Sequence, residues 1–127
     1  MPQTRELALT PEELTRLFVE RANARDPEGM AELYAADAVL AFPPGSTTVG
    51  REAIRTVCEQ LVAHAQLPIP YEPPQPTLYY GDDLALTSTQ AKDGTGLRVQ
   101  VVRRGADGGW VRILDRPEQH APQPGGE

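Results

Sequence analysis

The strongest candidate for chemistry is Asp115, a carboxylate near the end of the alternating segment Trp110–Pro117. On a strand period of two residues, its face would also carry core-type aliphatic side chains. The two faces would be Val111, Ile113 and Asp115 against Trp110, Arg112 and Leu114. If the face of Asp115 is buried, the carboxylate must accept hydrogen bonds, hold a proton or line a ligand pocket. Alternatively, the strand ends early and Asp115 caps a turn before Pro117.

His64 is the second candidate, because histidine titrates near neutral pH and His64 continues the apolar stripe of a predicted helix. A lone histidine in that place can equally be a packed residue at the rim of a pocket. Tyr34 could offer a phenolic hydroxyl to a ligand or simply pack. Ser88 is in phase with Leu86 on a predicted strand, so it points either into a pocket or to solvent.

Metal, phosphate and thiol chemistry are not indicated. The two histidines, His64 and His120, belong to no set of metal ligands, and no glycine-rich loop has the spacing of a phosphate-binding motif. The single cysteine, Cys58, lies on an apolar helical stripe, which is typical of a small buried hydrophobe. We therefore expect no metal and no organic cofactor.

Length and charge bound the remaining choices. A chain of 127 residues predicts one domain, over residues 1–117, followed by a flexible tail rich in Pro, Gly and Gln at 118–127. The net charge of −6, from 18 acidic and 12 basic residues, argues against nucleic acid or an anionic membrane as a partner. One cysteine and no long apolar run predict a cytoplasmic protein.

Three helices are expected in the N-terminal half. The first begins after Thr10-Pro11, where a capping hydroxyl precedes a proline, and runs to about Arg25. Asp26-Pro27 starts a second, shorter helix with Tyr34 on its inner side. A third helix is predicted over 51–65, with an apolar stripe at Ile54, Val57, Cys58 and Leu61.

The C-terminal half alternates strands and turns. Predicted strands at 77–80, 84–92, 97–104 and 110–116 are separated by glycine and aspartate turns. An earlier strand is expected at 38–42, and five prolines in 67–76 exclude a central strand there. Helices packed on one face of a curved antiparallel or mixed sheet form an α+β fold.

Three sequence features together resemble the nuclear-transport-factor-2-like superfamily, in particular its SnoaL-like polyketide cyclases and ketosteroid-isomerase-like proteins. They are the segment 18–38, Phe42-Pro-Pro-Gly followed by Val49-Gly-Arg-Glu-Ala-Ile-Arg, and Asp115-Arg116-Pro117 at the end of the last strand. The resemblance covers residues 8–117. It implies a cone in which three helices and a curved sheet enclose an apolar pocket. It leaves the function open, because the superfamily hosts both enzymes and non-catalytic binders.

The catalytic residues of ketosteroid isomerases do not carry over to this chain. The positions that resemble their proton-shuttling aspartate, first-helix tyrosine and protonated aspartate are Phe42, Phe18 and Val99. All three are apolar, so the resemblance does not imply steroid isomerase chemistry.

The SnoaL-type cyclase motif carries over in part. Its acid/base aspartate stands in an Asp-x-Pro context, as in Asp115-Arg116-Pro117. Its histidine on the preceding strand is matched near Gln100, which can hydrogen-bond an oxygen but cannot exchange a proton at neutral pH. The Asp-Arg-Asp network of epoxide hydrolases with this fold has a partial counterpart in Arg112 and Asp115, which the period of two places on opposite faces.

Two classes of function follow from the resemblance. The first is a cofactor-independent enzyme that cyclises, isomerises or hydrates an apolar, oxygenated, polyketide-like metabolite, with Asp115 moving the proton and His64 or Gln100 polarising or orienting. The second is a non-catalytic module that binds a ligand or a protein. In both, the pocket would be lined by Phe18, Tyr34, Phe42, Leu86, Ser88, Val99, Val101 and Ile113.

Folds of this kind associate through the sheet face turned away from the helices. In this chain, that face is predicted to carry Arg98, Gln100, Val102, Trp110, Arg112 and Leu114. A tryptophan in phase with a leucine on an outer face indicates a partner surface, so we expect a two-fold symmetric homodimer.

Overall fold

Two short helices open the part of the chain that the structure describes. The structure is a computed structural model, and it describes residues 5–92 and 96–117. Helix α1, Glu13–Asn23, buries Leu14, Leu17 and Ala22, which belong to the predicted apolar face. Helix α2, Pro27–Ala31, begins as predicted after Asp26, whose carboxylate caps it.

The cap of α2 depends on Gly29. The Asp26 carboxylate accepts a hydrogen bond from the Gly29 amide at 3.0 Å and another from Arg5 Nε at 2.9 Å. A Cβ atom at Gly29 would lie 2.2 Å from Asp26 Oδ2, so a larger residue would push the carboxylate away. The glycine therefore lets one aspartate both cap α2 and hold the start of the described chain.

A third helix and a set of strands complete the fold. Helix α3, Arg51–His64, confirms the third predicted helix. Within the described residues, the strands are β1 Tyr34–Leu40, β2 Thr48–Val49, β3 Leu78–Tyr80, β4 Leu84–Gln90, β5 Leu97–Arg104 and β6 Trp110–Arg116. The C-terminal strands are confirmed to within two residues of their predicted bounds. Tyr34 is the first residue of β1, so its predicted place on the second helix is wrong.

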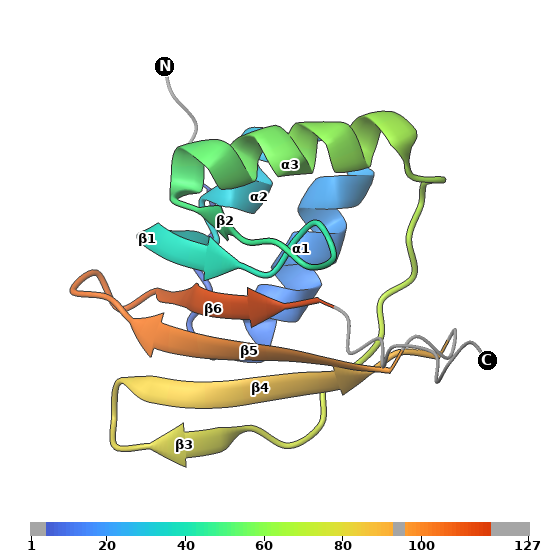
Figure 1. Cartoon of the computed structure of the whole chain (residues 1–127). Coiled ribbons are helices and arrows are strands. Elements are labelled where there is room, and N and C mark those ends of the chain that lie inside the picture. The colour runs from blue at the N-terminus through green and yellow to red at the C-terminus, as the bar shows by residue number, and fades with distance from the viewer. Residues whose placement is uncertain (1–4, 93–95, 118–127) are drawn as a thin grey trace.

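The strands form a single curved sheet in the order β2-β1-β6-β5-β4-β3. β1 pairs with β6 in parallel, and the other neighbours are antiparallel. In Figure 1, α3 lies over the end of the sheet that β2 and β1 form, and α1 lies behind the sheet. The predicted α+β class, with a curved mixed sheet and helices on one face, is confirmed.

The core lies between the helices and the inner face of the sheet. Strand register pairs Ala85 with Val102 and Thr87 with Gln100, so these four side chains point toward the helices. The buried cluster includes Leu14, Met30, Ile54, Ala85, Val102 and Trp110. Gln100 thus lies on the inner face, next to the apolar core.

The outer face of the sheet carries one apolar row. Register places one side chain from every strand in line: Val49, Val39, Leu114, Val101, Leu86 and Leu78. Of the residues predicted for this face, Leu114 is 50% exposed there. The prediction is wrong for Gln100, Val102, Trp110 and Arg112, which are buried on the inner side.

The segment 65–77, called the wall segment below, links α3 to β3 without forming a strand, and the predicted absence of a central strand there is confirmed. In Figure 1 it runs past one end of the strands. Asn23 and the backbone of Ile69 hold it to α1 through two hydrogen bonds, of 2.8 Å and 3.1 Å. No helix within 5–92 and 96–117 has the length and hydropathy needed to span a membrane. The predicted tail at 118–127 lies outside the described residues.

Candidate functional site

A cavity of about 1140 Å³ lies between the helices and the inner face of the sheet. Helices α1 and α3, strands β1, β5 and β6, and the wall segment all contribute to its lining. Much of that lining is apolar and includes Phe18, Val57, Leu61 and Ile69. The volume exceeds the roughly 300–1,000 Å³ typical of small-molecule sites, so a molecule with several rings has room to bind.

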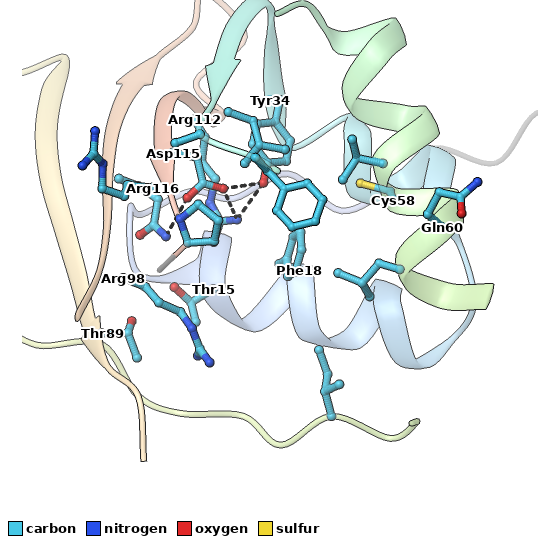
Figure 2. Close-up of a pocket in the computed structure, with 18 of the residues that line it drawn as sticks. Thr15, Phe18, Tyr34, Cys58, Gln60, Thr89, Arg98, Arg112, Asp115 and Arg116 are labelled. Atoms are coloured by element: carbon cyan, nitrogen blue, oxygen red, sulfur yellow. Dashed lines mark hydrogen bonds and ion pairs between the residues drawn. The ribbon is translucent and has the colours of Figure 1, made fainter. Parts of the chain in front are cut away.

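Four buried polar side chains meet at one wall of the cavity. They are Tyr34, Gln100, Arg112 and Asp115, called the inner polar group below. Figure 2 shows Tyr34, Arg112 and Asp115 converging beside the ring of Phe18. The four residues of the inner polar group come from three strands: Tyr34 from β1, Gln100 from β5, and Arg112 and Asp115 from β6.

A β-bulge in β6 places Arg112 and Asp115 on the same face. Two consecutive residues of β5 pair with Arg112 and Leu114, so Ile113 is an extra residue without a partner across the strands. Arg112 Nη1 lies 3.6 Å from Asp115 Oδ2. The prediction that these two residues occupy opposite faces is wrong, because the strict period of two is interrupted at Ile113.

Asp115 is 5% exposed and is held by two hydrogen-bond donors. Tyr34 OH donates to Asp115 Oδ2 at 2.6 Å, and Gln100 Nε2 donates to Oδ1 at 3.1 Å. An ionised carboxylate, which only accepts hydrogen bonds, fits both donors and the nearby guanidinium. Asp115 is therefore a buried carboxylate within β6 and not a cap beyond the strand.

Gln100 is oriented by a further hydrogen bond. Thr87 Oγ1 donates to Gln100 Oε1 at 2.8 Å, which turns the amide nitrogen toward Asp115. A glutamine held in this way can fix the position of the carboxylate. It cannot itself take up or release a proton at neutral pH.

Arg112 supplies the positive charge. Its guanidinium carbon lies 4.9 Å from the ring centroid of Phe18 and 5.7 Å from that of Tyr34. Within the described residues its guanidinium makes one hydrogen bond, from Nη1 to Tyr34 OH at 3.3 Å, and its buried Nε has no partner. Burial alone would lower the pKa of Arg112, but Tyr34 and Asp115 outweigh it and raise that pKa.

The other titratable groups near Asp115 stay protonated. Burial, together with the negative charge of Asp115, raises the pKa of Tyr34 well above its usual value, so the phenol acts as a donor. Burial likewise raises the pKa of Cys58 to about 11, and its thiol is neutral at physiological pH. Among these groups, the carboxylate of Asp115 is the hydrogen-bond acceptor and Tyr34 is a donor to it.

A second polar region of the cavity lies next to the wall segment. Thr15, Thr89 and Arg98 line it, as Figure 2 shows. Arg98 forms an ion pair with Glu72 of the wall segment, and Glu72 also accepts a hydrogen bond from the Lys92 amide at 3.0 Å. Polar contacts therefore fix the wall segment against the sheet.

Several predicted site residues line the cavity. These are Asp115, Gln100, His64, Phe18, Tyr34 and Phe42. His64 is exposed at the C-terminal end of α3, and no hydrogen bond joins it to Asp115 in the described part of the chain. Its position is that of a residue at the cavity rim.

The remaining predicted lining residues lie elsewhere, and this corrects the expectation. Register pairs Leu86 with Val101 and Ser88 with Val99, so these four share the outer face. Adjacent strand residues point to opposite faces. Because Gln100 faces the cavity, its neighbours Val99 and Val101 face away from it. Ile113 is the bulge residue and packs against the core.

The sequence interpretation did not place two residues, Thr87 and Arg112, in the polar network around Asp115. Thr87 orients Gln100, and Arg112 contacts Asp115. The sequence of β6 carried no signal for Arg112, because the bulge at Ile113 depends on how β6 pairs with β5. Over residues 5–92 and 96–117, no group of three or more His, Cys, Asp or Glu side chains could hold a metal ion.

Comparisons with known proteins agree with the fold and with the resemblance drawn from the sequence. The family model of the SnoaL-like domain matches residues 15–113. A search of curated proteins finds no match.

Three solved structures are similar. A domain of unknown function with a cystatin-like fold from Nostoc punctiforme has 17% identity and a TM-score of 0.71, over 87% of this chain and 75% of that one. A ketosteroid isomerase-like protein from Erwinia carotovora atroseptica has 15% identity and a TM-score of 0.66, over 87% and 94%. A nuclear-transport-factor-2-like protein from Novosphingobium aromaticivorans has 20% identity and a TM-score of 0.59, over 83% and 76%. Identities this low show the fold alone.

Proposed function

Because the chain belongs to the SnoaL-like domain family, we propose that its cavity takes up one small, apolar, oxygenated molecule and that Asp115 moves a proton of that molecule. The observation that carries this proposal is a buried carboxylate on the wall of a large, mostly apolar cavity. Cyclisation, isomerisation or hydration of a polyketide-like ring system is the reaction class that suits such a site.

Each member of the inner polar group has a role in this proposal. Asp115 accepts the proton and returns it, as a general base and then a general acid. Tyr34 and Gln100 hold its carboxylate in place through the hydrogen bonds described above. Phe18 and Phe42 shape the apolar part of the cavity.

Asp115→Asn tests the proposal once a ligand is in hand. Native mass spectrometry of the purified protein and a thermal-shift screen of polycyclic aromatic ketones would supply that ligand. Turnover should fall by about 10²–10⁴-fold, the usual contribution of a general acid or base, while ligand affinity stays within a few fold. Asp82→Asn, at an exposed turn position, is the matched control and should change nothing. Turnover that survives Asp115→Asn unchanged would overturn the proposal.

A non-catalytic binding module is the second candidate. It is favoured by one observation: both oxygens of Asp115 already accept hydrogen bonds from the protein. In that case the inner polar group would only shape and hold the cavity wall. Tight binding of a reactive ketone without any turnover by the wild-type protein would support this alternative.

We also propose that two copies associate through the outer face of the sheet. The apolar row across that face is self-complementary under a two-fold axis, and a single chain leaves it in water. Light scattering of the wild-type protein should give about twice the 13.8 kDa chain mass. The Leu114→Glu variant should give the mass of a single chain. A monomer mass for the wild-type protein at high concentration would contradict this.

A cytoplasmic location completes the proposal. The chain has one cysteine, Cys58, which is buried and can form no disulfide within the chain, and this suits a reducing compartment. Fractionation of cells that produce the protein would test this location.

A further inference from the structure

We propose that Arg112 binds the negatively charged oxygen that forms on the substrate when Asp115 removes a proton beside its carbonyl group. This inference rests on the proposed function, because it takes Asp115 as the proton acceptor. It assigns the electrophilic side of the site to a residue that the sequence interpretation did not place there.

The first argument is the unused hydrogen-bonding capacity of Arg112. A guanidinium has five N–H donors, and buried donors are normally hydrogen-bonded. Arg112 is 5% exposed, yet its one hydrogen bond to the described chain is the 3.3 Å contact from Nη1 to Tyr34. Its Nε is buried without a partner. A buried cation with donors to spare, on the wall of a cavity, is suited to an acceptor on a ligand.

The second argument is that Asp115 already takes the phenol hydrogen of Tyr34 and one amide hydrogen of Gln100. Tyr34 has one O–H, and it is directed to Asp115. The amide nitrogen of Gln100 is also turned to Asp115, because Thr87 holds the amide oxygen. Gln100 keeps one further amide hydrogen, whereas Arg112 keeps several donors and carries the positive charge, so Arg112 is the member of this group best suited to an anionic ligand atom.

The third argument is the position of the guanidinium. It lies against the rings of Phe18 and Tyr34. It also lies 3.6 Å from the carboxylate that would remove the proton. In an enolisation, the acidic carbon and the carbonyl oxygen are separated by two bonds, so base and oxygen-binding group must be neighbours. Arg112 and Asp115 meet this requirement.

The proton transfer conserves the buried charge pair. Asp115 takes a proton from the carbon beside the carbonyl, the C–H electron pair forms a C=C bond, and the carbonyl π pair moves to oxygen. The negative charge therefore leaves Asp115 and appears on the enolate oxygen, still beside the same guanidinium. Return of the proton to another carbon completes an isomerisation. Attack of the enolate carbon on a second carbonyl, followed by protonation of the resulting alkoxide by Asp115, completes a cyclisation.

2-Naphthol tests this role directly, because its anion resembles a planar enolate and absorbs differently from the neutral form. The Asp115→Asn variant imitates the protonated state of Asp115, in which Arg112 lacks its counter-charge. In this variant, bound naphthol should ionise about one pH unit lower than in water, which corresponds to a roughly tenfold preference for the anion.

Two further variants in the Asp115→Asn background complete the test. With Arg112→Met, neutral naphthol should still bind but the shift in ionisation should disappear or reverse. With Arg116→Met, which removes an exposed arginine from the same cavity, the shift should remain. If Arg112→Met does not fold, Arg112→Gln repeats the measurement with a side chain that can still reach Tyr34.

The outcomes separate this inference from the proposed function. Binding of neutral naphthol with an ionisation that is the same with and without Arg112 would overturn the role of Arg112 alone. Failure of every variant and of the wild-type protein to bind naphthol would overturn the cavity as a site for such molecules, and both proposals with it.

Discussion

Arg21 and Arg112 are both buried arginines, and they use their guanidinium groups in opposite ways. Arg21, in the last turn of α1, is 9% exposed and donates to two backbone oxygens, those of Gly29 and Glu6. Arg112 is 5% exposed, and within the described residues its guanidinium hydrogen-bonds Tyr34, lies 3.6 Å from Asp115 and stacks on Phe18. The first ties three segments of the chain together, and the second faces a cavity.

The electrostatic surroundings follow the same division. Burial lowers the pKa of Arg21, since its acceptors are neutral carbonyl groups. At Arg112, the effect of burial is outweighed by Tyr34 and Asp115, and the pKa is raised. A buried arginine that is satisfied by backbone oxygens stabilises a fold, whereas one that is paired with a side-chain carboxylate and retains donors is suited to a ligand.

The largest expected effect is the destabilisation caused by Arg21→Met. It removes two charge-assisted hydrogen bonds to backbone oxygens, one buried and one partly buried, so we expect a loss of about 4 kcal/mol in the free energy of unfolding. No second substitution should restore it, because the acceptors are backbone atoms. Urea unfolding at neutral pH measures the effect, with Arg103→Met at an exposed strand position as the control. A loss no larger than that of the control would remove the structural role of Arg21.

Arg112→Met should cost about 3 kcal/mol at neutral pH, because it leaves the carboxylate of Asp115 buried without its counter-charge. Unlike the loss at Arg21, this one should be reversible. Adding Asp115→Asn removes the unpaired charge, and the double variant should match or exceed the stability of the wild-type protein. A double-mutant cycle by urea unfolding gives the comparison. Additive losses in the double variant would show that Arg112 and Asp115 are not coupled.

A smaller effect is expected from Asp26→Asn, next to Arg21. The hydrogen bond from Arg5 lowers the pKa of Asp26. A lowered pKa stabilises the fold above the unfolded value of about 3.9, and this contribution is lost as the pH falls toward the folded value.

The side chains of Asp26 and Arg5 are about one-third exposed, and the effect is reduced accordingly. Between about pH 5 and pH 3, the wild-type protein should lose up to about 1 kcal/mol more than Asp26→Asn, in which the amide keeps the cap but not the charge. Thermal unfolding across this range measures the difference. Parallel curves for the two proteins would contradict the ion pair.

The smallest effect concerns Cys58, which lines the same cavity as Arg112 but has a pKa raised to about 11. Its thiol should react with iodoacetamide far more slowly than a free cysteine at pH 8, since so little thiolate is present. Mass spectrometry of the intact protein follows the reaction, with the urea-unfolded protein as the fast reference. Rapid labelling of the folded protein would show that the cavity activates this thiol.

The fold was largely predictable from local signals. Asp26-Pro27 marks the start of α2, and glycine and aspartate turns bound the C-terminal strands, because caps and turns depend on a few adjacent residues. The start of β1 was not predictable in this way. Tyr34 continues the helical spacing of Met30, and only its parallel pairing with Arg112, far along the chain, places it in a strand.

The candidate site was predictable in part. Asp115 was identified because it is in phase with core aliphatic residues on its strand, and Gln100 was identified through the family resemblance. Arg112 was assigned to the wrong face because the bulge at Ile113 depends on how β6 pairs with β5, and no residue within β6 signals the extra position.

The bulge also bears on how this pair of residues can vary between relatives. An arginine and an aspartate that are three positions apart across a bulge point the same way as an arginine and an aspartate two positions apart on a regular strand. Loss of the single codon for Ile113 would thus leave Arg112 and Asp115 facing the cavity and Leu114 facing outward. In an ordinary strand, inserting or deleting one residue moves every later side chain to the other face. At the bulge, the arginine and the aspartate keep the same face, so related proteins can share this pair at different sequence spacings.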